Sequence, residues 1–392
     1  MKLSEKALGI KPSSTLSITE KAGILRSEGK NVISFSIGEP DFDTPEHIKK
    51  AAVDAINAGF TRYTAAAGIV ELRKAVAKKL KEDNGLDYDY TQIVISNGAK
   101  HSLINALMAI INPGDEVIIP APYWLSYAEM VRLAGGTPVV VYMDQNEGFA
   151  LTRKVLEKGY SDKTKAVIIT SPSNPTGIVM DESQLREIAD FAVEKDIAVI
   201  ADEIYEKLIY SEDKKHISIA SLNKEIYDRT ITINGVSKSY AMTGWRLGYA
   251  CAPKVIMDQM VKIHQFAIMC APTTSQYAAV EALRNGDDDV ARMKESYNQR
   301  RNYLVHELRD MGLDCFEPYG AFYVFPSIKK FGLTSEEFAT RLLEEEKVAV
   351  VPGTAFGDCG EGFLRISYAY SLDDLKLALG RVRKFVERLE QK

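Results

Sequence analysis

The stretch Ala198-Val199-Ile200-Ala201-Asp202-Glu203-Ile204-Tyr205 sets the interpretation of the fold, because a short apolar run passes directly into polar residues. A run this short and rich in β-branched residues predicts a strand buried on both faces of a sheet. Residues 92–252 contain five more such runs, which alternate with helical patterns: Ile93–Ile95, Val117–Ile119, Pro138–Val141, Ala166–Ile169 and Thr230–Ile233. This alternation predicts an α/β fold with a mostly parallel sheet flanked by helices.

The pattern changes beyond Asn285, which indicates a second and smaller structural unit. A long charged helix is followed by three short apolar runs, Ala321–Phe325, Val348–Val351 and Phe363–Ile366, and by a last helix after Ser371. At 392 residues the chain is also too long for one ordinary core. We predict an N-terminal arm and part of the small domain in residues 1–44, a large domain in 45–285, and a small α+β domain in 286–392.

The composition argues against nucleic acid and membranes as partners. The chain has 49 basic and 54 acidic side chains, a net charge of −5, and this balance gives no reason to expect a polyanionic partner. The first residues lack the apolar core of a signal peptide, and no apolar run reaches the length of a membrane span. The four cysteines lack CxxC spacing, which favours reduced thiols over a metal site. We therefore expect a cytoplasmic protein without a metal.

Several reactive side chains follow strands of the predicted sheet. In open α/β sheets ligands gather at the carboxyl ends of strands, so Asp202, Asn174 and Lys238 are expected around one crevice. The segment Gly98-Ala99-Lys100 precedes a predicted helix, whose free N–H groups suit an anion. Ser237 and Arg246 can add a hydroxyl and a guanidinium, which matches the oxygens of a phosphate group.

Together these motifs resemble the fold-type-I enzymes that use pyridoxal 5′-phosphate, specifically the class I/II aminotransferases of the bacterial aspartate aminotransferase type. The resemblance covers nearly the whole chain and implies a seven-stranded sheet. The order and spacing of its short landmarks carry it: Gly38-Glu39-Pro40-Asp41-Phe42, Tyr63, Ala67-Gly68, Tyr123-Trp124, Asn174-Pro175-Thr176-Gly177, Asp202-Glu203-Ile204-Tyr205, Ser237-Lys238, Gly244-Trp245-Arg246-Leu247-Gly248-Tyr249, Val351-Pro352-Gly353 and Arg365-Ile366-Ser367-Tyr368.

The resemblance implies a role for each residue of the cofactor site. Lys238 would hold pyridoxal phosphate as a Schiff base and move the proton from the substrate Cα, and Asp202 would pair with the pyridine nitrogen, because a protonated ring accepts electrons. Tyr205, the third catalytic candidate, would bond the phenolate oxygen. The remaining cofactor contacts would be Asn174 at the same oxygen, Trp124 on the ring face, Ser237, Arg246, Gly98, Ala99 and Lys100 at the phosphate, and Tyr63 from a second subunit. A site shared in this way implies a homodimer.

The resemblance also assigns the substrate contacts. Arg365, with Gly38, Asn174 and Trp124 nearby, would bind the α-carboxylate, whereas Lys100 would meet the distal carboxylate of an acidic amino acid. The arm residues 13–15 would close over that carboxylate. The implied reaction is ping-pong transfer of the amino group from L-aspartate to 2-oxoglutarate, which gives oxaloacetate and L-glutamate.

Three alternatives stay open at the level of sequence. An aromatic or prephenate aminotransferase would use the same cofactor residues, and a pyridoxal-phosphate carbon–sulfur lyase would also keep Lys238. A non-catalytic binding module is a further alternative, although the retained lysine and the lack of an attached DNA-reading segment argue against it. The sequence does not rank aspartate, prephenate and aromatic substrates.

Overall fold

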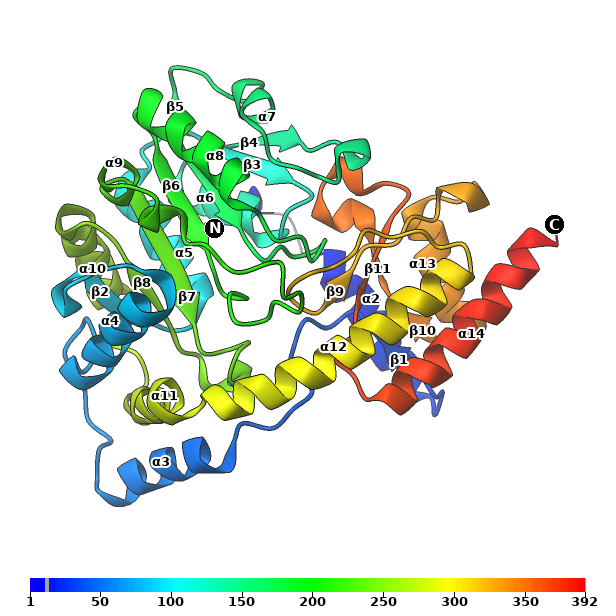
Figure 1. Cartoon of the computed structure of the whole chain (residues 1–392), viewed down its shortest axis with the longest axis horizontal. Helices are drawn as coiled ribbons and strands as arrows, with labels where there is room; N and C mark the ends of the chain where they lie inside the picture. Colours follow the sequence, from blue (N-terminus) through cyan, green and yellow to red (C-terminus); the bar gives the residue numbers. More distant parts are fainter. Residues whose placement is uncertain (11–13, 392) are drawn as a thin grey trace.

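The central element is a seven-stranded sheet (Figure 1). The computed structural model describes residues 1–10 and 14–391, without the side chains of 14–17. The strand order is β2-β8-β7-β6-β5-β3-β4, and only β8 runs antiparallel to its neighbours. The strands are β2 (Ile93–Ser96), β3 (Glu116–Ala121), β4 (Thr137–Tyr142), β5 (Thr164–Thr170), β6 (Ala198–Asp202), β7 (Thr230–Gly235) and β8 (Gly248–Cys251). The predicted mostly parallel seven-stranded α/β fold is therefore confirmed.

Helices cover both faces of this sheet because each central strand is apolar on both sides. In β5, Ala166 and Ile168 face a core shared with α5 (Ala99–Ile110), α6 (Ser126–Ala134) and α10 (Lys254–Ile268). Val167 and Ile169 face the opposite core, which contains α7 (Arg153–Glu157) and α8 (Glu182–Glu194). Successive side chains of a strand point to opposite faces, so one apolar run supplies both cores.

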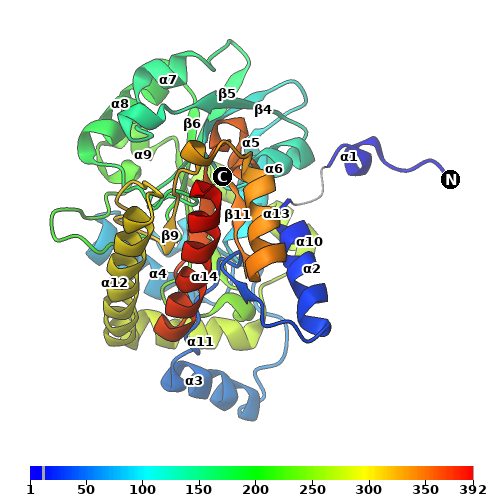
Figure 2. The same ribbon diagram turned by 90° about the vertical axis from the view of Figure 1, so that its right-hand side faces the viewer.

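A third core lies at the β2–β8 edge of the sheet. It joins α3 (Glu46–Asn57), α4 (Val70–Asn84) and α11 (Thr273–Asn285) to side chains of β2 and β8. The short helix α9 (Lys224–Tyr227) precedes β7. The helix α1 (Glu5–Leu8) lies near the N-terminus (Figure 2), and its Lys6 Nζ donates to the Leu133 carbonyl of α6 at 3.3 Å. Among the described residues, no helix is both long and apolar enough to cross a membrane.

The C-terminal part forms a separate core around two small sheets. One sheet has the order β11-β12-β9 and the other pairs β1 with β10. The strands are β1 (Ile33–Ser34), β9 (Tyr323–Val324), β10 (Val348–Ala349), β11 (Val351–Pro352) and β12 (Leu364–Ser367), and the helices are α2 (Ser14–Ser27), α12 (Asp287–Asp310), α13 (Ser335–Glu346) and α14 (Leu372–Glu390).

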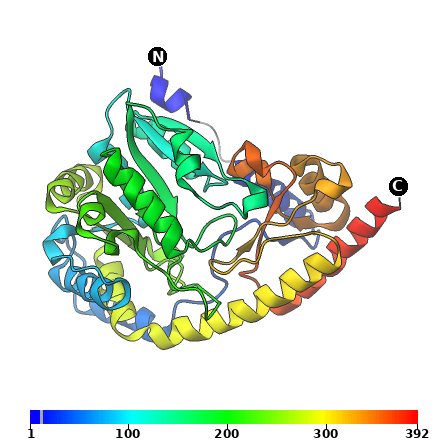
Figure 3. The same ribbon diagram turned by 45° about the horizontal axis from the view of Figure 1, so that its top comes forward.

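The long helix α12 joins the two parts of the molecule (Figure 3). Its first turns contribute Val290 to the core at the β2–β8 edge, whereas Met293 to Leu308 belong to the C-terminal core. The parallel pairing of β1 with β10 attaches the N-terminal segment to the same C-terminal part. These pairings support the predicted boundaries after residues 44 and 285, which stay a prediction.

Two details of the predicted strands differ from the structure. The run Val348–Val351 is not one strand, because β10 pairs with β1 and β11 pairs with β12 in another sheet. The strand β8 had no counterpart among the predicted runs, since Gly248-Tyr249-Ala250-Cys251 contains no β-branched residue. Its position between β2 and β7 determines its structure, and no local signal in the sequence does.

Candidate active site

The carboxyl ends of β5, β6 and β7 border a cavity of about 520 Å³. The chain reaches it from the sheet, from the N-terminus of α5 and from the C-terminal part. Most of the predicted site residues line this one cavity: Gly38, Ala99, Lys100, Trp124, Asn174, Asp202, Tyr205, Ser237, Lys238, Arg246 and Arg365. Segments up to 329 residues apart in the sequence therefore converge, as the contact between Ser36 and Arg365 illustrates.

Lys238 follows β7 and lies among opposing charges. Its Nζ donates a hydrogen bond to the carbonyl oxygen of Gly38 at 2.7 Å. Burial lowers the pKa of Lys238 to about 8, and the neighbouring guanidinium groups of Arg365 and Arg246 act in the same direction. A lysine with a lowered pKa has a larger neutral fraction near neutral pH, and the neutral amine is the nucleophilic form.

Asp202 is the last residue of β6 and is almost completely buried. Its Oδ2 accepts a hydrogen bond from the Tyr127 hydroxyl at 2.7 Å, and its Oδ1 accepts one from the Ile204 N–H at 3.3 Å. Burial raises the pKa of Asp202 to about 6. The carboxylate is therefore fixed in orientation and suited to a cationic partner in the cavity.

Arg365, on β12, is buried with few partners for its charge. Nη1 donates to Asn174 Oδ1 at 3.2 Å and Nη2 donates to the Ser36 carbonyl at 2.5 Å, whereas Nε has no hydrogen-bond partner among the described residues. The guanidinium lies 4.7 Å from the ring centroid of Tyr323. Burial lowers the pKa of Arg365. A buried guanidinium without a carboxylate beside it can bind an anionic ligand group.

The N-terminus of α5 forms an anion-binding region of the cavity. Gly98 caps the helix with φ +79°, and a Cβ there would lie 2.5 Å from Arg246 Nη2. Arg246 also has a left-handed backbone, and its Nη1 donates to the Thr243 carbonyl at 2.8 Å. The buried Ser237 hydroxyl lines the same cavity. Free N–H groups, a hydroxyl and a guanidinium therefore meet where an anion would bind.

Lys100 lines the cavity and is the second residue of α5. Its ammonium lies 4.9 Å from the ring centroid of Trp124, within the range of a cation–π contact. Burial lowers the pKa of Lys100, and the charge of Arg246 acts in the same direction. No described carboxylate forms an ion pair with it within 4 Å. This lysine is therefore a cation that a ligand carboxylate can reach.

Two further aromatic residues of the cavity were missed in the sequence. Tyr127 holds Asp202, and the Tyr323 hydroxyl lies 2.9 Å from the hydroxyl of Tyr205. Tyr323 also explains Gly38, since a Cβ at position 38 would lie 2.2 Å from the Tyr323 hydroxyl. The only signal for Tyr127 was its position three residues after Trp124, and Tyr323 was interpreted simply as part of a strand.

Tyr63 and Gly98 do not line the cavity among the described residues. Tyr63 is 83% exposed. Residue 13 of the predicted arm lies outside the described residues, as do the side chains of residues 14 and 15. Gly98 does not line the cavity directly but contacts Arg246, which does.

Comparisons with known proteins identify the class. Residues 30–382 match the family model of aminotransferase class I and II. An aspartate aminotransferase of Bacillus subtilis is 42% identical over 99% of this chain and 100% of its own, and an aromatic-amino-acid aminotransferase of Thermococcus litoralis is 45% identical over 99% of both. The structure of Thermus thermophilus aspartate aminotransferase with maleate superposes with a TM-score of 0.94, at 40% identity, over 98% of this chain and 99% of that one.

The chain belongs to the class I and II aminotransferases. It is therefore a transaminase that exchanges amino groups between amino acids and 2-oxo acids and uses pyridoxal 5′-phosphate. The cavity fits this cofactor in charge: it has a lysine with a lowered pKa, a buried carboxylate and an anion site at the N-terminus of α5. The absence of a Cβ at Gly98 leaves the room beside Arg246 that a phosphate needs.

Proposed function

We propose that this transaminase transfers the amino group of L-aspartate to 2-oxoglutarate by a ping-pong mechanism. One observation carries the proposal: besides Lys238 and Arg246, which the cofactor would occupy, two more cations line the cavity, the buried Arg365 and the accessible Lys100, and neither forms an ion pair with a described carboxylate. A substrate with two carboxylates satisfies both, whereas a substrate with an apolar side chain satisfies only Arg365. The Thermus thermophilus relative was crystallised with maleate, a dicarboxylate, which supports the same assignment.

We assign the roles of the residues from their surroundings. When bound, pyridoxal phosphate supplies an aldehyde carbon for the amine and a ring that withdraws electrons from the substrate Cα. Lys238 Nζ would bind the cofactor and, once the substrate amine has displaced it, would move the proton from the substrate Cα to the C4′ carbon of the cofactor, which keeps the amino nitrogen. Asp202 would keep the ring nitrogen protonated, and Tyr127 would fix the orientation of Asp202.

The other contacts hold the two reactants in place. Tyr205 and Asn174 would donate to the phenolate oxygen, and Trp124 would cover one ring face. The phosphate would be bound by Ser237, Arg246 and the backbone of Gly98, Ala99 and Lys100. Arg365 would bind the α-carboxylate bidentately beside Gly38 and Asn174, so that the Cα–H bond faces Lys238.

A second candidate function is transamination of aromatic amino acids. The edge of the cavity is partly apolar, with Ile37, Leu103, Trp124 and Leu125, and the exposed side chain of Lys100 can turn toward solvent. The Thermococcus litoralis relative is named an aromatic-amino-acid aminotransferase. Prephenate, which has both a ring-borne and an α-carboxylate, would be compatible with either arrangement.

A panel of amino donors under single-turnover conditions tests the choice. The cofactor absorbance should change faster with aspartate and glutamate than with phenylalanine, tyrosine or a prephenate-derived donor. If phenylalanine reacts faster than aspartate at equal subsaturating concentration, the acidic-substrate assignment is wrong and the aromatic alternative replaces it.

We also propose a homodimer in which Tyr63 of one subunit completes the phosphate site of the other. Tyr63 and Phe266 are 83% and 91% exposed, and the Thr273 hydroxyl donates to the Arg62 carbonyl, which joins the two exposed regions. Mixing Lys238→Ala with Tyr63→Ala subunits should restore sites that contain both wild-type residues. A monomer in sedimentation equilibrium, or no gain in cofactor affinity on mixing, would contradict the shared site.

A further inference from the structure

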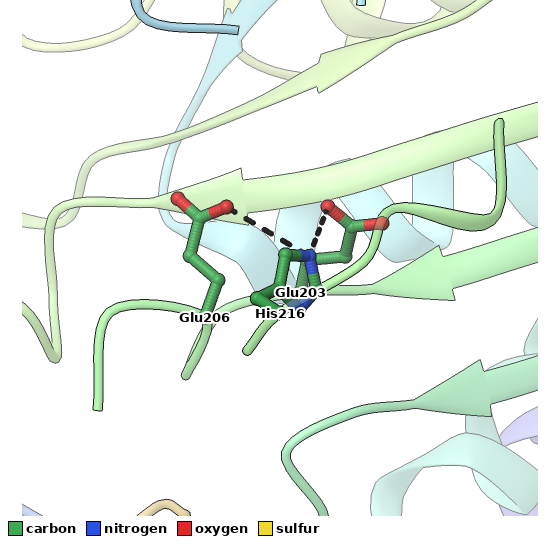
Figure 4. A group of neighbouring side chains, drawn as sticks. All are labelled: Glu203, Glu206 and His216. Atoms are coloured by element: carbon green, nitrogen blue, oxygen red, sulfur yellow. Dashed lines mark ion pairs between the residues drawn. The ribbon is translucent and has the colours of Figure 1, made fainter. Parts of the chain in front are cut away.

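A buried network of ionisable side chains lies directly behind Asp202, outside the cavity. It contains Glu203, Glu206, Lys79, Asn84 and His216, all at least nine-tenths buried. Figure 4 shows His216 between the two carboxylates. His216 Nε2 lies 3.0 Å from Glu203 Oε2 and 3.9 Å from Glu206 Oε2. The proposed mechanism uses none of these residues.

Donors already occupy the carboxylate oxygens of this network. The Ser218 hydroxyl donates to Glu203 Oε2 at 2.7 Å, and Asn84 Nδ2 donates to Glu206 Oε2 at 2.7 Å. The Lys79 ammonium contacts Glu206 directly and also donates to Asn84 Oδ1 at 2.7 Å. Two acids, one histidine at ligand spacing and an ammonium on one of the acids make a self-compensated ion network, not a metal site.

The charges of the network balance when His216 is protonated. Burial alone would raise the pKa of Glu206, but the charges of Lys79 and His216 reverse this and lower it to about 2. Burial alone would lower the pKa of His216, but Glu203 and Glu206 reverse this and raise it, against an opposing contribution from Lys79. Two carboxylates then face two cations, which makes burial of all four charges tolerable.

The network holds the segment that carries two of the predicted cofactor contacts. Glu203 lies between Asp202 and Tyr205, its N–H donates to the Ile233 carbonyl of β7 at 2.8 Å, and its carbonyl accepts from the Glu206 N–H at 2.9 Å. Through Asn84 and Lys79 the segment is tied to α4, and through His216 and Ser218 it is tied to the loop before residue 219. Because Glu203 directly follows Asp202 in the chain, these contacts also restrain the backbone of Asp202.

We propose that Glu203 and His216 are positioning residues for Asp202, and that their buried ion pair keeps the Asp202 carboxylate aligned with the ring nitrogen of the cofactor. The inference rests on the role proposed above for Asp202. It assigns a function to the network beyond stability: the Glu203–His216 pair ties the segment after Asp202 to the loop before residue 219, while Glu206 ties the same segment to α4.

The test compares isosteric variants at the network with a matched pair elsewhere. Glu203→Gln and His216→Gln remove one charge each, and Ser218→Ala removes one hydrogen bond to Glu203. His47 is the control, because its ring also bridges two carboxylates, Glu281 at 2.7 Å and Asp289 at 2.8 Å, on the outer helices α3, α11 and α12. His47→Gln therefore removes an equivalent bridge that does not contact the cavity. Asp202→Asn reports the effect of losing the ring contact itself.

Two readouts are independent of turnover: the dissociation constant of pyridoxal phosphate for the apo protein, and the pH midpoint of the visible absorbance of the bound cofactor. We expect Glu203→Gln and His216→Gln to weaken cofactor binding roughly 3- to 30-fold and to shift the midpoint by roughly 0.4–1.5 pH units, in the direction of Asp202→Asn. Ser218→Ala should act in the same direction with a smaller effect, and His47→Gln should change neither readout.

A normal midpoint and affinity in Glu203→Gln and His216→Gln, alongside a shift in Asp202→Asn, would overturn the inference and leave the proposed function intact. No shift in Asp202→Asn would instead refute the role of Asp202, and the inference with it. If the charge variants do not fold, Ser218→Ala decides between the same outcomes.

Discussion

Two lysines line the cavity, Lys238 after β7 and Lys100 near the start of α5, and they have different surroundings. Lys238 is held by the Gly38 carbonyl among Asp202, Arg365 and Arg246, and burial brings its pKa to about 8. Lys100 is only partly buried, and its ammonium lies 4.9 Å from the Trp124 ring centroid. Lys238 is held in one orientation, which suits the chemical step that all substrates share. Lys100 is freer to move, which suits a residue that distinguishes among substrates.

The largest expected effect is at Lys238. Lys238→Ala should reduce turnover by about 10⁴-fold or more, because it removes both the cofactor amine and the general base. The melting temperature should stay close to that of the wild type, since the side chain makes a single hydrogen bond. Steady-state assays and thermal unfolding measure the two quantities. Appreciable residual transamination would contradict the assignment.

A smaller and selective effect is expected at Lys100. Lys100→Ala should lower kcat/KM for aspartate by about 10- to 100-fold, the value of one hydrogen bond to a charged group, and should leave phenylalanine nearly unchanged. Lys74→Ala is the matched control, because Lys74 lies 5.5 Å from the Tyr90 ring centroid, away from the cavity. Equal losses for aspartate and phenylalanine would remove Lys100 from substrate selection.

The smallest effect concerns pH and separates the two lysines in the wild-type chain. Because burial lowers the pKa of Lys238 to about 8, its neutral fraction rises as the pH approaches 8 and then levels off. The rate at which the apo protein takes up pyridoxal phosphate should rise by about tenfold between pH 7 and pH 9 and be flat above pH 9. A rate that keeps rising to pH 10 would indicate an amine with an ordinary pKa.

The sequence predicted the sheet well where strands are buried on both faces. The six apolar runs correspond to β2 to β7, since a strand between two helical layers must be apolar throughout. The sequence did not indicate β8, or the division of Val348–Val351 between two sheets, because partners far along the chain determine both. Strand pairing between distant segments cannot be predicted from the local amino-acid composition.

The site could be predicted wherever a motif follows a strand directly. Asp202, Asn174 and Lys238 lie at strand ends, and the structure places all three around one cavity. Tyr127 lies 75 residues before Asp202 in the sequence and contacts it because α6 packs on the sheet. The spacing of residues in the sequence therefore did not predict this contact. The adjacent acid Glu203 belongs to another environment, since its oxygens contact Ser218 and His216. The direction of a side chain depends on how the surrounding elements pack, and the identity of two neighbouring residues does not predict it.

We propose that Lys238 binds the cofactor covalently in the cavity. Reduction of the loaded protein with borohydride, followed by peptide mapping with mass spectrometry, tests it most directly, since reduction converts the linkage into a stable amine. We expect one phosphopyridoxyl group per chain, on Lys238, and none on Lys100. A label on Lys100 or on another lysine, with Lys238 unmodified, would contradict it.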